Sequence, residues 1–429
     1  MTTVRLRHLA QVNPLTPAFD RLSGDDELTF LPMETVWPGS RLDISRRRRR
    51  ESVATGYTRF QDGDVLVPKI TPTFEAGRAI LISGLLGGVG AGTTELHVLR
   101  AGPQIDARFL LYVVSTHSFL KVGEAEMYGV AGQQRVPDSF LRDLPVELPS
   151  MAEQRRIADF LDAETVRIDK LSETRERQLG LLAEAAFSRS YDAVRGASVA
   201  GDRKQSGLTW LGSVPANWRV AAVTHFFQVE LGKMLSQERV SGEYLRPYLR
   251  VANVQWDHID VDELAVMDFP PDEQARYRLK AGDLLVNEGG SWPGRAAIWG
   301  GEIPEIYYQK ALHRIRPLGD ELPRWLYYCL VVAERLKVFQ VQGNTSTMTH
   351  LTREQLRPQR FPFPDVQTQR KLVADLDAAA RSDEALRSLL QRQLALFAER
   401  RQALITAAVT GQFDVSTASG RNVTEGITE

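Results

Sequence analysis

The chain has 429 residues, of which 43% are hydrophobic and 25% are charged, and its formal net charge at pH 7 is −1. This apolar content excludes a wholly disordered chain and suffices for about two to four globular domains. The near-neutral charge argues against a simple basic nucleic-acid-binding protein, although it does not exclude every DNA-binding role.

The cysteine count and the hydropathy suggest a compartment. Cys329 is the only cysteine, so the chain has no intramolecular disulfide and no site that needs several thiolates. We expect Cys329 to be a small buried residue. No stretch approaches the roughly 20 apolar residues of a membrane span, and the first residues lack the apolar core of a signal peptide. We therefore expect a cytoplasmic protein without membrane association.

Residues 1–149 are predicted to form a mixed α/β domain. Gly and Pro punctuate this region, and short β-rich runs such as DVLVPKI (64–70) and LHVLR (96–100) lie between them. The run of arginines at 46–50 is too polar for a core and is typical of a solvated loop. Residues 1–150 hold 17 basic and 17 acidic side chains, so this run does not make the domain basic.

Two long helices divide the rest of the chain. The first is predicted over 150–196, because Ser150 and Glu153 have the spacing of a capping box and Gly196 is suited to end a helix. The following segments are predicted as a linker (197–207), a second mixed α/β domain (208–364), a second long helix that starts at Asp365 (365–411) and a flexible tail (412–429). Each helix would span about 65 Å.

The two halves of the chain are similar in sequence. QDGDVLVPK at Gln61 aligns with KAGDLLVNE at Lys280 with an offset of 219 residues, and ELHVLR aligns with ALHRIR with an offset of 216. From FLLYVV at Phe109 and RWLYYC at Arg324 the offset is 215, and it stays so to the ends of both helices. Because the matches keep their order over most of each half, the chain is interpreted as a tandem duplication.

Both helices carry an imperfect heptad pattern. Its apolar members are Ile157, Leu161, Ile168, Leu171 and Leu182 in the first helix and Leu372, Leu376, Leu386, Leu390 and Phe397 in the second. Helices of this length with one apolar stripe are most simply stabilised by packing against each other. The alternative is that each helix lies separately on its own domain.

The starts of the helices carry a family resemblance. LPSMAEQRRIADFLD (148–162) and FPDVQTQRKLVADLD (363–377) each place a glutamine five residues after a proline. In this order, domain, helix, domain and helix, the chain resembles the DNA-specificity (S) subunit of type I restriction-modification systems. GDVLVPKITPTFEAGRAILI (63–82) resembles a common pattern of the target-recognition domains of that family. The second domain matches the recognition-domain pattern less closely, which implies a different target.

The resemblance implies a fold and a set of partners. The fold would be α+β, a tandem duplication of a target-recognition domain plus a long helix, with the two helices in an antiparallel coiled coil. Each domain would read one half of a bipartite, gapped target in double-stranded DNA, and the helices would dock two methyltransferase subunits, with restriction subunits joining through the complex. The chain itself would be non-catalytic and would hold no cofactor or metal, because S-adenosylmethionine, ATP and Mg²⁺ belong to the partner subunits.

Candidate DNA-contacting side chains fall into three groups. After a predicted strand of each copy lie Lys69, Thr71 and Thr73, and Asn287, Ser291 and Trp292. Before the closing strand of each copy lie Gln133, Gln134 and Arg135, and Asn344, Thr345, Ser346 and His350. Gln and Asn pair with adenine and Arg with guanine, so the second group is the first choice for base reading. Arg46, Arg47 and Arg48 are candidates for phosphate contacts. Turn chemistry and a solvated loop are the competing explanations.

The sequence offers no catalytic set. The glycine-rich GGVGAG (87–92) leads into a predicted strand, whereas a cofactor loop should open a helix, and no Gly-Lys-Ser/Thr phosphate loop occurs. Two alternatives stay open. One is a coiled-coil scaffold that joins two protein-binding domains without DNA. The other is the specificity subunit of a related system in which methylation and cleavage share one polypeptide.

Overall fold

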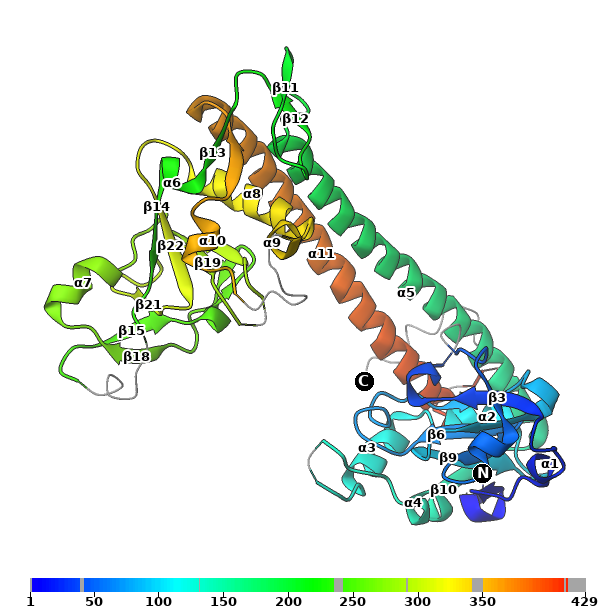
Figure 1. Cartoon of the computed structure of the whole chain (residues 1–429). Coiled ribbons are helices and arrows are strands. Elements are labelled where there is room, and N and C mark those ends of the chain that lie inside the picture. The colour runs from blue at the N-terminus through cyan, green and yellow to red at the C-terminus, as the bar shows by residue number, and fades with distance from the viewer. Residues whose placement is uncertain are drawn as a thin grey trace. The chain divides into compact units, whose positions relative to one another are not determined.

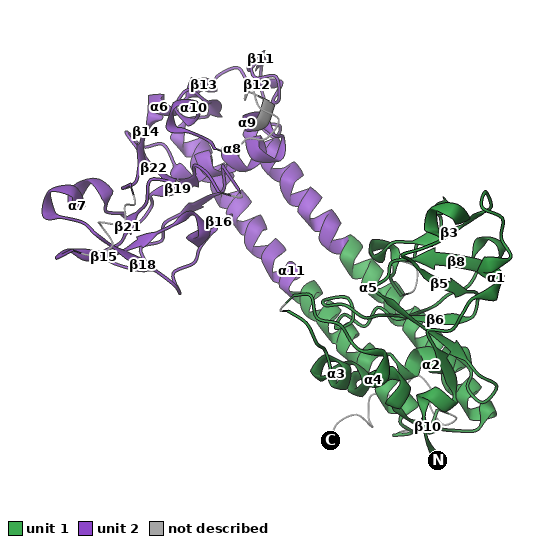
Figure 2. Cartoon of the chain, turned by 60° about the horizontal axis from the view of Figure 1, so that its bottom comes forward, with its two compact units in different colours: residues 1–177, 389–429 green, residues 178–388 purple. Residues whose placement is uncertain are grey.

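The computed structural model describes residues 2–38, 42–130, 132–234, 242–290, 292–341, 350–412 and 414–415. The chain divides into two compact units (Figure 2), residues 1–177 with 389–429 and residues 178–388. Each unit contains one α/β domain and a part of both long helices. Among the described residues no helix combines the length and apolar character that a membrane span needs.

The first domain, drawn in blue to cyan in Figure 1, contains two four-stranded sheets by its strand pairing. Its strands are β1 (Thr2–Arg5), β2 (Ala10–Val12), β3 (Glu27–Leu31), β4 (Arg47–Arg49), β5 (Thr58–Gln61), β6 (Asp64–Pro68), β7 (Ile80–Leu81), β8 (Val89–Gly92), β9 (Leu96–Ala101) and β10 (Pro145–Leu148), and its helices are α1 (Pro17–Asp20), α2 (Ala107–Val113), α3 (His117–Ala125) and α4 (Asp138–Asp143). One sheet has the order β2-β9-β6-β7, the other β4-β3-β8-β5, and β1 pairs with β10.

The second domain repeats the first of these sheets. Its strands are β11 (Arg203–Gln205), β12 (Ser213–Pro215), β13 (Arg219–Ala222), β14 (Phe227–Leu231), β15 (Leu245–Leu249), β16 (Val254–Gln255), β17 (His258–Ile259), β18 (Ala265–Asp268), β19 (Leu284–Asn287), β20 (Ala296–Ile298), β21 (Tyr307–Tyr308), β22 (Leu312–Pro317) and β23 (Arg360–Phe363). Its helices are α6 (Val223–Phe226), α7 (Pro271–Tyr277), α8 (Pro323–Arg335), α9 (Val338–Val341) and α10 (Arg353–Leu356). The sheet β14-β22-β19-β20 matches β2-β9-β6-β7 strand for strand, and the β13-β23 pair matches β1-β10.

The glycine-rich run at 87–92 is explained by packing inside a sheet. Gly90 and Gly92 lie in β8, between β3 and β5. A Cβ atom on Gly90 would be 2.3 Å from the Phe60 ring, and one on Gly92 would be 2.5 Å from the carbonyl oxygen of Leu31. Only glycine fits at these two positions, so the run has a structural cause.

The two long helices, α5 (Met151–Val194) and α11 (Val366–Val409), have 44 residues each. In the first unit the start of α5 lies beside the end of α11 (Figures 1 and 2), and Arg401 and Asp169 form an ion pair at 2.5 Å. In the second unit the end of α5 lies beside the start of α11, and Arg189 pairs with Asp383. The two helices therefore run in opposite directions within each unit. The predicted α+β fold class is confirmed, whereas coiled-coil packing remains a prediction.

The predicted seam is buried where it meets the domain cores. Ile157, Leu161 and Ile168 belong to the core of the first domain, as do Leu404 and Ile405 of α11, and Leu372 and Leu376 belong to the core of the second domain. Leu390 is buried, and Leu182 and Phe397 are half-buried. Leu171 and Leu386 are 40% and 44% exposed, so these two members of the predicted imperfect seam are not buried. Polar residues, Arg175 and Asp383, interrupt the heptad pattern beside them.

A buried glutamine fixes the start of each long helix. Gln154 and Gln369 are 1% and 0% exposed, and they lie at equivalent places in α5 and α11. The glutamine Nε2 donates to a proline carbonyl, and its Oε1 accepts from a backbone N–H ahead of a domain helix: Gln154 bonds Pro149 (3.0 Å) and Asp106 (2.8 Å), and Gln369 bonds Pro364 (2.9 Å) and Leu322 (3.0 Å). The repeated glutamine thus joins each helix to its own domain.

Candidate nucleic-acid interface

Two of the candidate loops of the first domain lie against each other. The Thr71 N–H donates to the Gln134 carbonyl at 3.0 Å, and the Gln134 N–H donates to Thr71 Oγ1 at 3.2 Å. The Val136 N–H donates to the Lys69 carbonyl at 2.8 Å. The segment that follows β6 and the segment that precedes α4 therefore form one surface, although they are far apart in the sequence.

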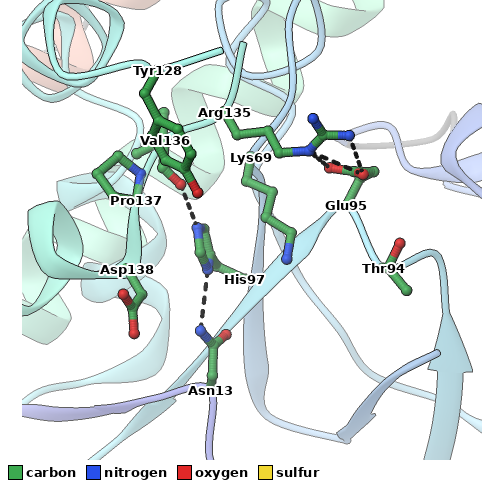
Figure 3. Close-up of a pocket in the computed structure, with 10 residues that line it drawn as sticks. All are labelled: Asn13, Lys69, Thr94, Glu95, His97, Tyr128, Arg135, Val136, Pro137 and Asp138. Carbon is green, nitrogen blue, oxygen red and sulfur yellow. Dashed lines mark hydrogen bonds and ion pairs between the residues drawn. The ribbon is translucent and has the colours of Figure 1, made fainter. Parts of the chain in front are cut away.

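This surface contains an open pocket of about 370 Å³ (Figure 3). It is lined by Asn13, Lys69, Thr94, Glu95, His97, Tyr128, Arg135, Val136, Pro137 and Asp138. Figure 3 shows the Lys69 side chain extending into the pocket between Glu95 and His97. Donors, acceptors and an aromatic side chain thus meet in one concave place.

An ion pair holds Arg135 in the wall of the pocket. Its Nε donates to Glu95 Oε2 at 2.9 Å and its Nη2 donates to Oε1 at 2.8 Å, a bidentate arrangement that fixes the plane of the guanidinium. These hydrogen bonds hold the pKa of Glu95 below its usual value. The Arg135 Nη1 bonds only the Gln133 carbonyl, at 3.3 Å, among the described residues.

Lys69 carries a partly dehydrated charge. Its side chain is half-buried, and burial is the largest cause that lowers the pKa of its ammonium group. Within the described part of the chain, no hydrogen bond or ion pair of Lys69 Nζ is found, and the charge of Glu95 is the largest effect that raises its pKa against burial. A cation that has lost water without a direct partner is ready to bind an acceptor from outside.

His97 connects the loop of Arg135 to the sheet. The Asn13 Oδ1 accepts from the Val98 N–H at 3.0 Å, so the Asn13 Nδ2 faces His97 Nδ1 and donates to it at 3.2 Å. His97 Nε2 therefore carries the proton and donates to the Val136 carbonyl at 2.9 Å. Burial lowers the pKa of His97, consistent with a neutral ring whose role is to position the loop.

The second domain repeats this series of hydrogen bonds, which we call the frame, with different side chains. His313 Nε2 donates to the Leu351 carbonyl at 2.7 Å, the Leu351 N–H donates to the Glu288 carbonyl, and the Glu288 N–H donates to the Ala311 carbonyl at 2.9 Å. In the first domain the same series of bonds runs through His97, Val136, Lys69 and Glu95. Glu288 therefore takes the place of Lys69, Ala311 that of Glu95, and His350 that of Arg135.

Glu288 is the charged group of this second surface. Its side chain is half-buried, and burial is the largest cause that raises the pKa of its carboxyl group. His350 is exposed and lies beside it, since a Cβ atom on the adjacent Gly289 would be 2.8 Å from the His350 ring. Within the described residues, no hydrogen bond or ion pair of the Glu288 carboxylate is found.

Two candidates face inward, which corrects their prediction as DNA contacts. Asn287 is 1% exposed and its Nδ2 donates to the Val254 carbonyl at 3.3 Å, because the end of β19 turns this side chain toward a short 3-10 helix, η7 (Val251–Asn253). Thr73 is 8% exposed, and its Oγ1 donates to the Ile70 carbonyl at 2.6 Å, which stabilises the local turn. Both side chains shape the loops from within.

The remaining candidates have varied surroundings. Trp292 is 56% exposed, with the Arg295 guanidinium 4.3 Å from the centre of its ring, and Gln133 is exposed, whereas Gln134 and Thr71 are half-buried. Ser291, Asn344, Thr345 and Ser346 lie outside the described residues.

The arginine run is a strand, which corrects the predicted solvated loop. Residues 47–49 form β4, paired with β3, and this pairing gives alternate arginines different neighbours. Arg46 pairs with Glu34 at 2.9 Å, the Arg47 Nη1 donates to Thr29 Oγ1 at 3.2 Å, and the Arg48 guanidinium lies 5.3 Å from the centre of the Phe30 ring. The three side chains stay exposed, so a phosphate contact remains a proposal for them.

Sequence reasoning missed several residues of the pocket, namely Asn13, Glu95, His97, Tyr128 and Asp138. One signal was present, because ELHVLR and ALHRIR place a histidine at the same position of both copies. Glu95 had no such signal, because its role depends on Arg135, which lies 40 residues away in the chain.

Comparisons with known proteins agree with this architecture. Residues 215–392 match the family described as type I restriction modification DNA specificity domain. The specificity subunit of the type I restriction enzyme EcoAI of Escherichia coli is 39% identical over 153 residues, which cover 35% of this chain and 26% of that subunit. The EcoKI specificity subunit of Escherichia coli K12 is 23% identical over 287 residues, 64% of this chain and 59% of that subunit. The first alignment thus spans about a quarter of the relative's length.

Solved structures extend the likeness to nearly the whole chain. A chain from a study of complex assembly and conformational transition in the type I R-M system has a TM-score of 0.71 at 17% identity, and the match covers 96% of this chain and 98% of that one. The HsdS subunit of Thermoanaerobacter tengcongensis has a TM-score of 0.51 at 17% identity, with 96% and 97% covered. The chain therefore shares the fold of these solved structures.

Proposed function

We propose that this chain is the DNA-specificity subunit of a type I restriction-modification complex. It binds double-stranded DNA, and each domain reads one half of a bipartite, gapped target. The specificity-domain match over residues 215–392 and the shared fold support this assignment. The subunit is non-catalytic in this proposal, and the partner subunits bind S-adenosylmethionine, ATP and Mg²⁺.

One observation carries the proposal. The frame that joins His97, Val136 and Lys69 recurs at His313, Leu351 and Glu288, yet the side chains that the two frames present differ in charge. A scaffold that needed two equal binding surfaces would gain nothing from this change. Two readers of unlike DNA sequences require it, because base edges differ in their donors and acceptors.

The long helices support docking of methyltransferase subunits. Large apolar side chains are exposed along both of them: Val166, Leu171 and Leu181 on α5 and Leu386, Leu389 and Leu396 on α11, with exposed fractions between 40% and 63%. Large exposed apolar patches mark protein–protein contact surfaces. We propose that two methyltransferase subunits cover them and that restriction subunits join through the complex.

The charge of the chain fits a reader that depends on its partners. Residues 1–150 hold 17 basic and 17 acidic side chains, and residues 197–365 hold 20 of each. Phosphate contacts supply most of the affinity for DNA, and they need an excess of basic groups. The isolated chain should therefore bind DNA weakly, and the methyltransferase subunits should supply the remaining positive charge.

Base-resolution methylome sequencing of the host tests this function. The wild-type strain should show a gapped motif modified on both strands, a deletion strain should lose it, and a strain with the gene restored should regain it. An identical methylome in all three strains would contradict DNA specificity and would favour the protein-binding scaffold. A motif that depends on a single methyltransferase-nuclease polypeptide would assign the chain to the related fused system.

Docking can be tested separately. Leu389 and Leu396 are seven residues apart on α11 and are 51% and 54% exposed, so they share one face of the helix. Replacing both with Asp should abolish co-elution with the methyltransferase subunits and leave the fold intact. The matched control is Gln391→Asp, an exposed polar position on the same helix, which should co-elute normally. Normal co-elution of the double variant would place the docking surface elsewhere.

A further inference from the structure

The two domains present opposite charges at one equivalent position of their frames. Lys69 and Glu288 each follow a buried strand, β6 and β19, that occupies the same place in its sheet. In both, the backbone carbonyl accepts from the residue that a buried histidine holds, Val136 or Leu351. The backbone is therefore matched, and the side chain is what differs.

The first surface presents donors. Lys69 Nζ extends into the pocket without a direct hydrogen bond or ion pair among the described residues, and the Arg135 Nη1 beside it has one weak bond, to the Gln133 carbonyl at 3.3 Å. Glu95 occupies the other two guanidinium nitrogens, Nε and Nη2, and so fixes the direction in which Nη1 points. An arriving group on this surface meets two cationic donors.

The second surface presents an acceptor. Glu288 occupies the position of Lys69, and Ala311 occupies that of Glu95. The carboxylate of this surface therefore lies where the first domain has the lysine ammonium group. His350 lies next to Glu288, and its electrostatic effect lowers the pKa of that carboxyl group against the larger effect of burial. A DNA phosphate would be repelled by this carboxylate, whereas an amino group in the major groove would be bound by it.

Base edges match this difference. Guanine offers two acceptors, O6 and N7, in the major groove, and lysine or arginine binds them. Cytosine offers its N4 amino group as a donor, and glutamate accepts from it. We propose that Lys69 reads a guanine in the half-site of the first domain and that Glu288 reads a cytosine in the half-site of the second. This inference rests on the proposed function and adds the base class for each domain.

A phosphate contact is the competing role for Lys69. The same pocket contains Glu95 and Asp138, whose carboxylates would repel a phosphate placed between them. A guanine edge is neutral, and it can use the lysine as donor while its own amino and ring N–H groups stay paired with cytosine. The composition of the pocket therefore favours a base edge.

The first experiment replaces Lys69 with Met, which keeps the length of the side chain and removes its charge. The methylome of a host that carries the variant should show the same motif with one guanine of one half-site relaxed to other bases. Binding of the complete complex to oligonucleotides should lose about 10- to 100-fold of its preference for guanine at that position. Lys121→Met is the matched control, because Lys121 is exposed and pairs with Glu124 in the same domain, and its motif should be unchanged.

The second experiment replaces Glu288 with Gln. Glutamine pairs with adenine through N6 and N7, so the cytosine of the other half-site should become adenine or a mixture of both. Glu302→Gln, an exposed position of the same domain, is the control. The two variants should affect different half-sites.

Several results would overturn the inference. A folded Lys69→Met protein with an unchanged motif would show that Lys69 does not read DNA. An equal loss at every site, with no new base tolerated, would assign Lys69 to a phosphate contact. A Glu288→Gln motif that keeps its cytosine would refute the second half. If the wild-type gene itself directs no gapped motif, the proposed function fails and this inference fails with it, so the two failures are distinguishable.

Discussion

The two domains share a set of internal polar contacts and differ in the side chains on their candidate DNA-binding surfaces. The agreement lies in polar contacts that occur twice: buried glutamines at the helix starts (Gln154 and Gln369), buried histidines (His97 and His313), tyrosine–aspartate hydrogen bonds (Tyr112 to Asp162 and Tyr328 to Asp377) and arginine–aspartate pairs (Arg100 with Asp64 and Arg316 with Asp283). The difference lies in the side chains that the frame carries outward, such as Lys69 and Glu288. In the proposed function, stability and specificity thus depend on separate residues.

Exchanging a whole domain should change the methylated motif more than any single substitution, because it replaces every side chain that this domain presents. Replacing residues 1–149 with the equivalent domain of a relative should change one half of the methylated motif and leave the other half and the gap unchanged. Specific sites are bound about 10³- to 10⁷-fold more tightly than other DNA, so the old half-site should disappear from the methylome. Successful exchange requires that the new domain fit Ile157 and Leu161 of α5, which belong to the core of the first domain.

A reciprocal exchange of residues 208–364 is the control, and it should change the other half-site. If either exchange altered both halves of the motif, the two domains would not read DNA independently.

The sequence predicted most of the scaffold and less of the surface. Caps at Ser150 and Asp365 and a 4-3 apolar pattern are local signals, and both long helices formed where these signals lie. The strand order was not predictable, because pairing partners such as β2 and β9 are distant in the sequence. The arginine run became a strand because β3 lies beside it, a contact that no local pattern encodes.

The surface depends even more on tertiary contacts. Lys69 and Arg135 were both candidates, but their meeting in one pocket results from hydrogen bonds between distant backbone segments. Thr73 and Asn287 are polar residues in the same segments, yet they face inward, because the local backbone at each position decides the direction of the side chain. Residue type alone therefore pointed to loops that lie together, but it did not predict which of their side chains face outward.

The next largest effect is on stability and concerns α11, whose end is more deeply buried than its middle. Leu404 is 1% exposed in the core of the first domain, so Leu404→Ala should lower the free energy of unfolding of the first unit by about 2–5 kcal/mol. Leu386→Ala, at a position that is 44% exposed, should cost less than about 1 kcal/mol. Denaturant unfolding of the full chain measures both. Equal costs would mean that the middle of the helix is as closely packed as its end.

A pH-dependent effect should appear in the second domain. Burial lowers the pKa of His313 to about 4, from 6.5 in an exposed histidine, and its buried Nδ1 has no hydrogen-bond partner among the described residues. Above pH 6.5 the ring is neutral in the folded and unfolded states. Between pH 6.5 and 4 only the unfolded state binds a proton, so the free energy of unfolding should fall by up to about 3 kcal/mol as the pH drops.

His313→Gln is the variant that isolates this effect, because Gln can still donate to the Leu351 carbonyl and does not titrate. Urea unfolding at pH 7 and at pH 4.5 should show a smaller pH dependence for the variant than for the wild-type chain. Carboxylates titrate in both proteins, so the difference between the two curves reports His313. Identical pH dependence in both would mean that the ring is protonated in the folded state.

The smallest expected effect tests whether the shared frame has equal importance in both domains. Gln154→Met and Gln369→Met would each leave two groups without their partner, namely the proline carbonyl before the long helix and the backbone N–H of Asp106 or Leu322 before a domain helix. Each should lower the free energy of unfolding of its own unit by about 1–3 kcal/mol, because an unpaired buried polar group costs that much. The exposed Gln133→Met serves as control and should leave stability unchanged. Because neither glutamine lies in the proposed reading surfaces, both variants should keep the wild-type motif in the methylome, at a reduced modification level. A large cost in one domain and none in the other would show that the two copies, although equal in geometry, no longer depend on the same contact.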